Sequence, residues 1–199
     1  MATRIDFYFD LLSPYSYLAS TVLPRLAAEH AASIRYRPFS LVELMQRVGN
    51  RPTTLECRNK FAYAIADLRR WAHSYGVAFA PTPHFESIDF ALLDRGALAA
   101  IDEGRGAGYV EAVYAAIWAD GIDLGQRPEL IAVLDRAGWN GASLLERAGS
   151  EEYAGKLAAN IAEAAERGVF GSPTIFVGDE MFFGNDRFGF VADALRAAA

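Results

Sequence analysis

The stretch IDFYFDLLSPYSYL, residues 5–18, contains the signals that decide the fold. Ile5–Phe9 is rich in aromatic and β-branched residues, which is typical of a strand. Pro14 is well placed for the first position of a helix, because the N–H group that proline lacks would make no hydrogen bond within the helix there. Apolar residues then recur at helical spacing to about Glu29, and a second strand is predicted at Ile34–Phe39. A strand–helix–strand order predicts two parallel strands joined by a crossover helix.

The last thirty residues predict a second, smaller unit of sheet. A strand is expected at Thr174–Val177, directly after Ser172-Pro173. Gly178-Asp179 is a hairpin signal, and the return strand fits Met181–Phe183. A final helix is expected at about Phe188–Arg196.

The residues between these two units predict helices and no strand. Apolar periodicity and helix end signals mark helices near residues 61–75, 110–121, 129–137 and 150–167. The βαβ and ββα units, with Pro173 opening the third strand, form the layout of a thioredoxin-like fold. We therefore expect an α/β protein: one thioredoxin-like unit over residues 1–199, with a large all-helical insertion at about 45–167.

Composition narrows the classes of function. The chain has 199 residues, of which 52% are hydrophobic, so it can bury a sizeable core. Its net charge is 19 − 25 = −6, without a basic run, which argues against nucleic-acid partners and an anionic membrane surface. Cys57 is the single cysteine, so neither an internal disulfide nor a Cys-rich zinc site is expected. The N-terminal residues do not resemble a signal peptide, and we expect a cytoplasmic protein.

The strand–helix junction at Ser13-Pro14-Tyr15-Ser16 is where a thioredoxin-like fold places its active site. Disulfide exchange there requires a Cys-x-x-Cys pair. Serine occupies both positions in this chain, so dithiol redox chemistry is excluded. Ser13 lies at a helix N-terminus, where free N–H groups and the helix dipole favour an anion. The alternative is that Ser13 only caps the helix.

Three motifs carry a specific resemblance. They are FYFDLLSPYSYLA at residues 7–19, RPFSL with GNRP at 37–41 and 49–52, and VFGSPTIFVGDEMFFGNDR at 169–187. With them the chain resembles the 2-hydroxychromene-2-carboxylate isomerases of the DsbA-like, kappa-class glutathione transferase superfamily. The resemblance covers nearly the whole chain. It implies a glutathione-dependent cis–trans isomerisation in the breakdown of polycyclic aromatic compounds, with a small aromatic carboxylate as substrate and a homodimer as the assembly.

The resemblance also implies roles for individual residues. Ser13 is expected to donate a hydrogen bond to the glutathione thiolate; no partner base is evident that would make it a nucleophile. Ser172, before a cis Pro173, is expected to pair with the cysteinyl segment of glutathione, although a trans proline at a strand start is generally commoner.

The run Gly184-Asn185-Asp186-Arg187 is expected to bind the γ-glutamyl head of glutathione. Backbone N–H groups before the last helix can receive its carboxylate, and Asp186 can accept from its ammonium group. Arg187 either orients Asp186 or faces solvent. The alternative for the run is a simple helix cap.

Asn50 and Lys60 are the candidates for contact with the substrate. Asn50 belongs to a G-N-x-P run of the family, and Lys60 matches a following lysine with about one residue of displacement. Members of the family often have a further lysine before that run, where this chain has Gln46. The alternative for Lys60 is an ordinary solvated charge. The histidines His30, His73 and His84 show no metal-ligand spacing, and no metal is expected.

Three functions follow. The first is an isomerase in which a thiolate adds reversibly to a conjugated carbon, so that a double bond becomes single and rotates. The second is a kappa-like glutathione transferase that conjugates small electrophiles and releases the adduct. The third is a non-catalytic thioredoxin-like module that binds extended peptides.

Overall fold

Four strands form one sheet in the computed structural model, which describes residues 3–198. The strands lie in the order β2-β1-β3-β4. β1 pairs in parallel with β2 and antiparallel with β3, and β4 pairs antiparallel with β3. Their bounds are β1 Arg4–Phe9, β2 Ser33–Pro38, β3 Thr174–Val177 and β4 Glu180–Phe183. Since β1 is an inner strand, the loop that follows it, with Ser13, lies at the middle of one end of the sheet.

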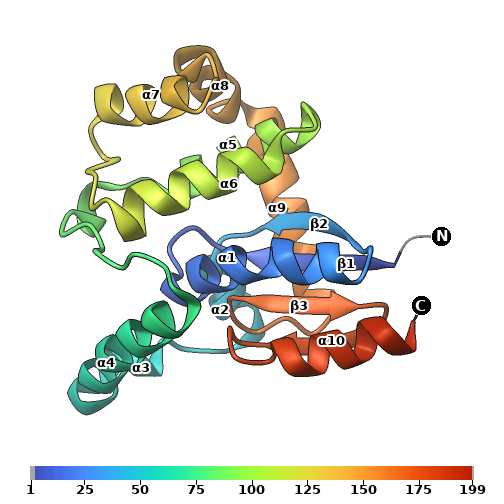
Figure 1. The fold of residues 1–199 in the computed structure, drawn as a ribbon. Coiled ribbons are helices and arrows are strands. Elements are labelled where there is room, and N and C mark those ends of the chain that lie inside the picture. Colours follow the sequence, from blue (N-terminus) through green and yellow to red (C-terminus); the bar gives the residue numbers. More distant parts are fainter. Residues whose placement is uncertain (1–2, 199) are drawn as a thin grey trace.

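Helices cover both faces of the sheet. α1 (Pro14–Glu29) and α10 (Phe188–Ala197) lie on one face, and α9 (Glu151–Glu166) lies on the other (Figure 1). The strand β1 is buried along Ile5–Phe9 because both of its faces are covered. Successive side chains of β1 point to opposite faces of the sheet and therefore have different neighbours. Phe7 and Phe9 stack with ring centroids 5.1 Å apart, whereas Asp6 and Tyr8 contact charged groups on the α9 side.

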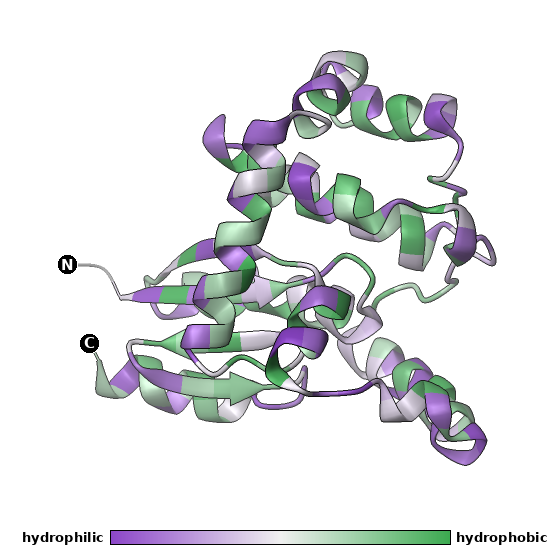
Figure 2. Cartoon of the chain, turned by 180° about the vertical axis from the view of Figure 1, so that it is seen from behind, coloured by the Kyte–Doolittle hydropathy of each residue, from purple (hydrophilic) through white to green (hydrophobic). Residues whose placement is uncertain are grey.

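The segment between β2 and β3 is helical throughout its regular elements. Their bounds, besides α9, are α2 Leu41–Val48, α3 Thr53–Glu56, α4 Arg58–Tyr75, η1 Phe85–Ser87, α5 Phe90–Asp102, α6 Gly106–Tyr114, η2 Ala115–Ala119, α7 Arg127–Arg136 and α8 Gly141–Ala148. α5 to α8 stack together on one side of the sheet, and α3 and α4 project on another (Figure 1). Figure 2 shows hydrophobic residues interspersed with hydrophilic ones along the projecting pair. Two large side chains of these helices are exposed, Leu55 at 69% and Tyr63 at 63%.

These observations confirm the predicted thioredoxin-like α/β fold with a helical insertion. Pro14 is at the first position of α1, as expected. The insertion becomes helical at Leu41, earlier than the predicted residue 45, and it contains α5 and α8, which the periodicity did not single out. Ser150 occupies the N-cap of α9, although its side chain makes no capping hydrogen bond within the described residues. No helix within residues 3–198 is both long and apolar enough to cross a membrane.

Candidate active site

Ser13 is the N-cap of α1, at the end of the loop that follows β1. Its hydroxyl accepts a hydrogen bond from the Ser16 N–H at 3.2 Å, and its side chain is buried, with 4% exposed. The Tyr15 N–H, in the first turn of α1, has no hydrogen-bond partner among residues 3–198. The capping role of Ser13 is therefore real, and it leaves one backbone donor of the helix N-terminus uncommitted.

Ser172 and Pro173 lie directly against this helix start. The peptide bond between them is cis, as the resemblance implied. Ser13 Oγ donates to the Ser172 carbonyl oxygen at 3.1 Å, and Ser16 Oγ lies 2.6 Å from Ser172 Oγ. Ser172 Oγ also accepts from the Asp10 N–H at 3.0 Å. Three serine hydroxyls thus join two segments that are about 160 residues apart in the chain.

This arrangement adds a condition to the predicted role of Ser13. Its hydroxyl proton is already directed at the Ser172 carbonyl, so donation to a thiolate requires the hydroxyl to rotate. The Ser172 N–H, in contrast, makes no hydrogen bond within the described residues. It is therefore a backbone donor that an extended ligand can use without displacing another group.

The loop from Gly184 to Asp186 is attached to the same site. The Gly184 N–H donates to the Pro173 carbonyl at 3.1 Å. Gly184 has φ +103°, and a Cβ there would lie 2.9 Å from Asp186 Oδ1, so the position favours glycine. Asn185 is buried, and its carbonyl accepts from Tyr75 Oη at 2.5 Å.

The N-terminus of α10 follows this loop and lacks a side-chain cap. The N–H groups of its first turn, residues 188–190, have no hydrogen-bond partner in the part of the chain that the structure describes. Asp186, beside them, is exposed and forms an ion pair with Arg187. Arg187 is exposed as well, so it both pairs with Asp186 and faces solvent, and the structure does not separate the two predicted alternatives.

Two tyrosines extend the site toward α4, and the sequence did not assign them a role. Burial, together with the nearby Asp67, Tyr63 and Asp186, raises the pKa of Tyr15 to about 12. Burial also raises the pKa of Tyr75, although its hydrogen bond to Asn185 opposes this. Both phenols are therefore neutral at physiological pH, and the hydrogen bond of Tyr75 to the Asn185 carbonyl places α4 beside the loop of Gly184.

The two predicted substrate residues lie apart from each other. Asn50 Nδ2 donates to the Phe170 carbonyl at 2.8 Å, which ties the G-N-x-P run to the segment before Ser172. The Asn50 amide oxygen accepts from the Arg51 N–H, so both ends of the amide are already bonded. Lys60, in the first turn of α4, is exposed and has no ion-pair partner within residues 3–198. The structure brings Asn50 near the serine cluster and leaves Lys60 outside it.

The remaining candidates show no arrangement for chemistry. His84 Nδ1 lies 3.8 Å from Asp123, whose carboxylate also accepts from Ser87 Oγ at 2.7 Å. This cluster fastens the loop before α5 rather than activating the hydroxyl, because the hydroxyl bonds the carboxylate and not the imidazole. Within residues 3–198, no three His, Cys, Asp or Glu residues gather as metal ligands.

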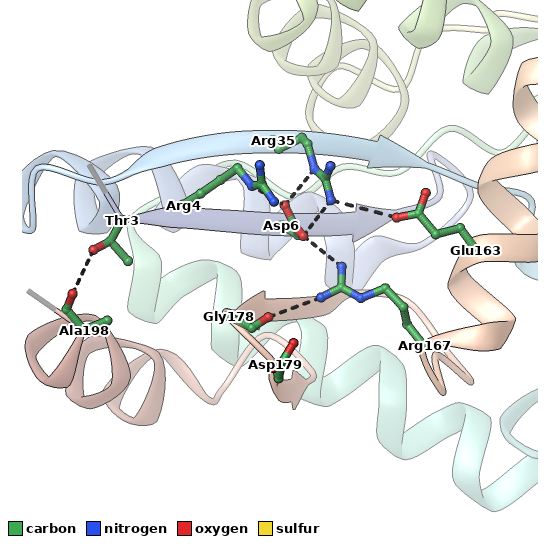
Figure 3. Close-up of a pocket in the computed structure, with 9 residues that line it drawn as sticks. All are labelled: Thr3, Arg4, Asp6, Arg35, Glu163, Arg167, Gly178, Asp179 and Ala198. Carbon is green, nitrogen blue, oxygen red and sulfur yellow. Dashed lines mark hydrogen bonds and ion pairs between the residues drawn. The ribbon is translucent and has the colours of Figure 1, made fainter. Parts of the chain in front are cut away.

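Neither of the two cavities described in the molecule contains Ser13. One, of about 420 Å³, is lined by Val48, Gly49, Asn50 and residues just before Ser172. The other, of about 560 Å³, lies on the α9 side of the sheet (Figure 3). There Arg4, Arg35 and Arg167 surround the buried Asp6, which accepts from all three. Three carboxylates line this second cavity as well, so its charges compensate one another, and we interpret the cluster as structural.

Asp6→Asn is expected to lower the free energy of unfolding by about 2 kcal/mol at pH 7, since one partner of a charge-assisted network is lost. Burial opposes ionisation of Asp6, but hydrogen bonds from Arg35 and Arg167 outweigh it and lower its pKa. The carboxylate therefore stabilises the fold above the unfolded-state pKa of about 3.9, and this contribution is lost as the pH falls through the folded-state value.

Urea unfolding at pH 7 and near pH 2 measures this effect. The free energies of unfolding of Asp6→Asn and of the wild type should converge near pH 2. Glu29→Gln, which removes an exposed i,i+4 partner of Arg25, is the matched control and should change little. An equal loss of stability at both pH values would contradict the electrostatic explanation.

Comparisons with known proteins agree with the motifs. A family model described as a DSBA-like thioredoxin domain matches residues 4–196. The chain is 37% identical to a 2-hydroxychromene-2-carboxylate isomerase of Sphingobium xenophagum, over 98% of this chain and 99% of the relative. It is 29% identical to glutathione S-transferase kappa 1 of Caenorhabditis elegans, over 97% and 91% of the two chains. A solved 2-hydroxychromene-2-carboxylate isomerase structure superimposes with a TM-score of 0.89 at 33% identity, over 98% of this chain and 95% of the other.

Proposed function

This chain belongs to the 2-hydroxychromene-2-carboxylate isomerase family of DSBA-like thioredoxin domains and is an isomerase, and we propose that it uses glutathione to interconvert cis and trans forms of an aromatic carboxylate like 2-hydroxychromene-2-carboxylate. The observation that supports this most is the junction of Ser13 with Ser172. It combines a helix N-terminus, a hydroxyl and a backbone N–H that has no partner among residues 3–198, in a site without cysteine.

The residues present fit a γ-glutamyl tripeptide at three separate points. Ser13 Oγ and the Tyr15 N–H offer two donors to a sulfur anion. The Ser172 N–H offers a donor to a peptide carbonyl. The uncapped N-terminus of α10 suits a carboxylate, and Asp186 suits the ammonium group beside it. No cation is needed for the sulfur, because the donors at the start of α1 stabilise the anion.

When bound, glutathione supplies a thiolate that can add to a conjugated carbon and leave it again. The chain's own residues do the rest. Ser13 and the start of α1 lower the energy of the anion, which favours its formation at neutral pH. Ser172 and Pro173 orient the peptide backbone, and Gly184, Asn185 and Asp186 fix the end that carries both charges. Holding the reacting partners together is worth several orders of magnitude in rate.

Asn50 and Lys60 remain proposals for contact with the substrate. The ammonium group of Lys60 has no ion-pair partner within residues 3–198 and could bind a carboxylate. Lys60 lies on α4, the helix that also carries Asp67 and Tyr75 beside the site. Asn50 could contact the substrate only if its amide exchanges one of its two present hydrogen bonds. The exposed Leu55 and Tyr63 of α3 and α4 are consistent with the proposed homodimer.

The function is tested by turnover of 2-hydroxychromene-2-carboxylate with and without glutathione. We expect turnover only when glutathione is present, with no net loss of glutathione as the reaction proceeds. Equal rates in both conditions would remove the thiolate from the mechanism.

A kappa-like transferase is the second candidate, because the chain also resembles glutathione S-transferase kappa 1 over nearly its whole length. Both functions use the same thiolate site, so Ser13 does not separate them. Incubation with a model aryl halide does: one glutathione consumed for each product formed would favour the transferase.

A further inference from the structure

Two carboxyl groups are buried directly behind the loop that carries Ser13. Asp10 follows β1 and is 2% exposed; Asp94 lies on α5 and is 0% exposed. Within residues 3–198, the hydrogen bonds that these carboxyl groups accept all come from backbone N–H groups, and none comes from a cationic side chain. Buried carboxyls without a counter-charge are rare, because ionising them is unfavourable.

The two carboxyls hold successive residues of the loop. Asp94 Oδ1 accepts from the Leu11 N–H at 3.2 Å. Asp10 Oδ1 accepts from the Leu12 N–H at 2.7 Å, and its Oδ2 accepts from the Leu41 N–H, at the start of α2, at 2.5 Å. Asp94 therefore links the helical insertion to the loop two residues before Ser13.

The loop carbonyls are held as firmly as its N–H groups. Trp118 Nε1 donates to the Leu11 carbonyl at 3.1 Å, and Tyr114 Oη donates to the Asp10 carbonyl at 3.0 Å. The Ser13 N–H donates to the same Asp10 carbonyl at 3.0 Å. The position of Ser13 thus depends on side chains of the insertion.

The two carboxyls differ in how well a negative charge on them would be stabilised. Asp10 accepts two N–H groups, and burial raises its pKa to about 6. Asp94 accepts one, and its Oδ2 is buried without a partner among residues 3–198. Burial and the charge of Asp10 raise the pKa of Asp94 well above its usual value.

Within residues 3–198, the other titratable groups whose charge acts on Asp94 offer no compensating charge. They are the phenols of Tyr109 and Tyr114 from α6, and Asp89 at the N-cap of α5, whose own side chain is largely exposed. All of them are acidic or neutral. A second negative charge on Asp94 would therefore lie opposite only like charges and dipoles.

We propose that Asp94 is a positioning residue of the active site and acts as a neutral carboxylic acid, whose oxygen fixes Leu11 and thereby the loop of Ser13, while the pair carries a single negative charge on Asp10. The catalytic part of this inference rests on the proposed function. A neutral Asp94 also avoids a second buried charge near a site that has to stabilise an anion.

The test compares Asp94→Asn, which stays neutral and keeps an oxygen acceptor, with Asp94→Leu, which removes the acceptor. Leu98→Ala, one turn further along α5, controls for loss of core packing alone. We expect Asp94→Leu to lower kcat about tenfold to hundredfold through misplacement of the loop. We expect the kcat of Asp94→Asn to stay within about threefold of the wild-type value. Leu98→Ala should lose stability with little change in kcat.

The pH dependence of unfolding provides a second readout, which a purely structural hydrogen bond would not change. An acid whose pKa is raised on folding makes the protein less stable as the pH rises from about 4 toward the folded-state value. From pH 5 to 8, the wild type should therefore lose stability relative to Asp94→Asn. Asp10 contributes to both proteins, so the difference isolates Asp94.

Three outcomes would overturn the inference. If Asp94→Asn lowers kcat as much as Asp94→Leu does, Asp94 acts as an ionised carboxylate. If Asp94→Leu is folded and fully active, the residue does not position the loop. If the two stabilities follow parallel pH profiles, Asp94 is not held neutral, and this comparison decides alone if Asp94→Leu does not fold. A wild type without glutathione-dependent turnover would contradict the proposed function instead, and the pH comparison would still stand.

Discussion

Replacing Ser13 by alanine is expected to lower isomerase turnover about hundredfold to thousandfold while the protein remains folded. Removal of one positioned donor from a developing or resident anion has effects of this size in other enzymes. Ser13 is 4% exposed as a residue and lies at the start of α1, so water cannot readily replace its hydroxyl. The apparent pKa of the bound glutathione thiol should rise by about one to two units, which corresponds to one hydrogen bond to a charged group.

Calorimetric titration with glutathione and the ultraviolet absorbance of the thiolate measure this effect. Ser13→Ala also removes a helix cap, which costs about 1 kcal/mol of stability. Asn140→Ala is the matched control, because Asn140 caps α8 by accepting from the Ser143 N–H, on the side of the molecule away from the site. It should lose similar stability with an unchanged thiol pKa. An unchanged thiol pKa in Ser13→Ala would show that Ser13 only caps α1 and does not stabilise the thiolate.

Asp186→Asn is expected to raise the Kd of glutathione about tenfold to hundredfold, with kcat at saturating glutathione close to that of the wild type. Asp186 is the carboxylate beside the uncapped start of α10 that we assign to the ammonium group. A hydrogen bond between charged groups that ligand binding shields from water is worth about 1.5–3 kcal/mol.

Asp193→Asn is the control for Asp186→Asn on the same helix. Asp193 is exposed and pairs with Arg196 at the other end of α10, so it changes the net charge equally and lies away from the site. It should leave the Kd within about twofold. If both variants bind glutathione equally, the γ-glutamyl head is not held by Asp186.

The ends of the chain could be predicted from the sequence because their signals are local. Aromatic residues in Ile5–Phe9, Pro14 and the Gly178-Asp179 turn each specify their own neighbourhood. The parallel pairing of β1 with β2 follows from the crossover helix that joins them, because it returns the chain to the end of the sheet where β1 begins. These elements place Ser13, Ser172 and the loop of Gly184 at one end of the sheet.

α5 could not be predicted because it has no polar face. Its residues Leu93–Ala100 are buried almost without interruption, so they lack the 3.6-residue alternation that marks a surface helix. Gly96 weakens the helical signal further, although it is needed there: a Cβ would lie 2.2 Å from Tyr109 Oη. Asp94 was missed together with its helix.

The contacts within the site that join distant segments could not be predicted from the sequence either. The partner of the Ser13 hydroxyl is a backbone carbonyl 159 residues away, and Tyr75 bonds a carbonyl 110 residues away. No local pattern distinguishes these side chains from ordinary helix residues. Residue type and motif therefore predicted which segments form the site, and the fold was needed to show how their donors are engaged.

The most direct test of the account is the position of the sulfur in a crystal structure of this protein with reduced glutathione. The account predicts that the sulfur lies within hydrogen-bonding distance of Ser13 Oγ and the Tyr15 N–H, with the Ser13 hydroxyl turned away from the Ser172 carbonyl. A tripeptide whose sulfur points away from the start of α1, or that occupies the arginine-lined cavity on the α9 side instead, would contradict it.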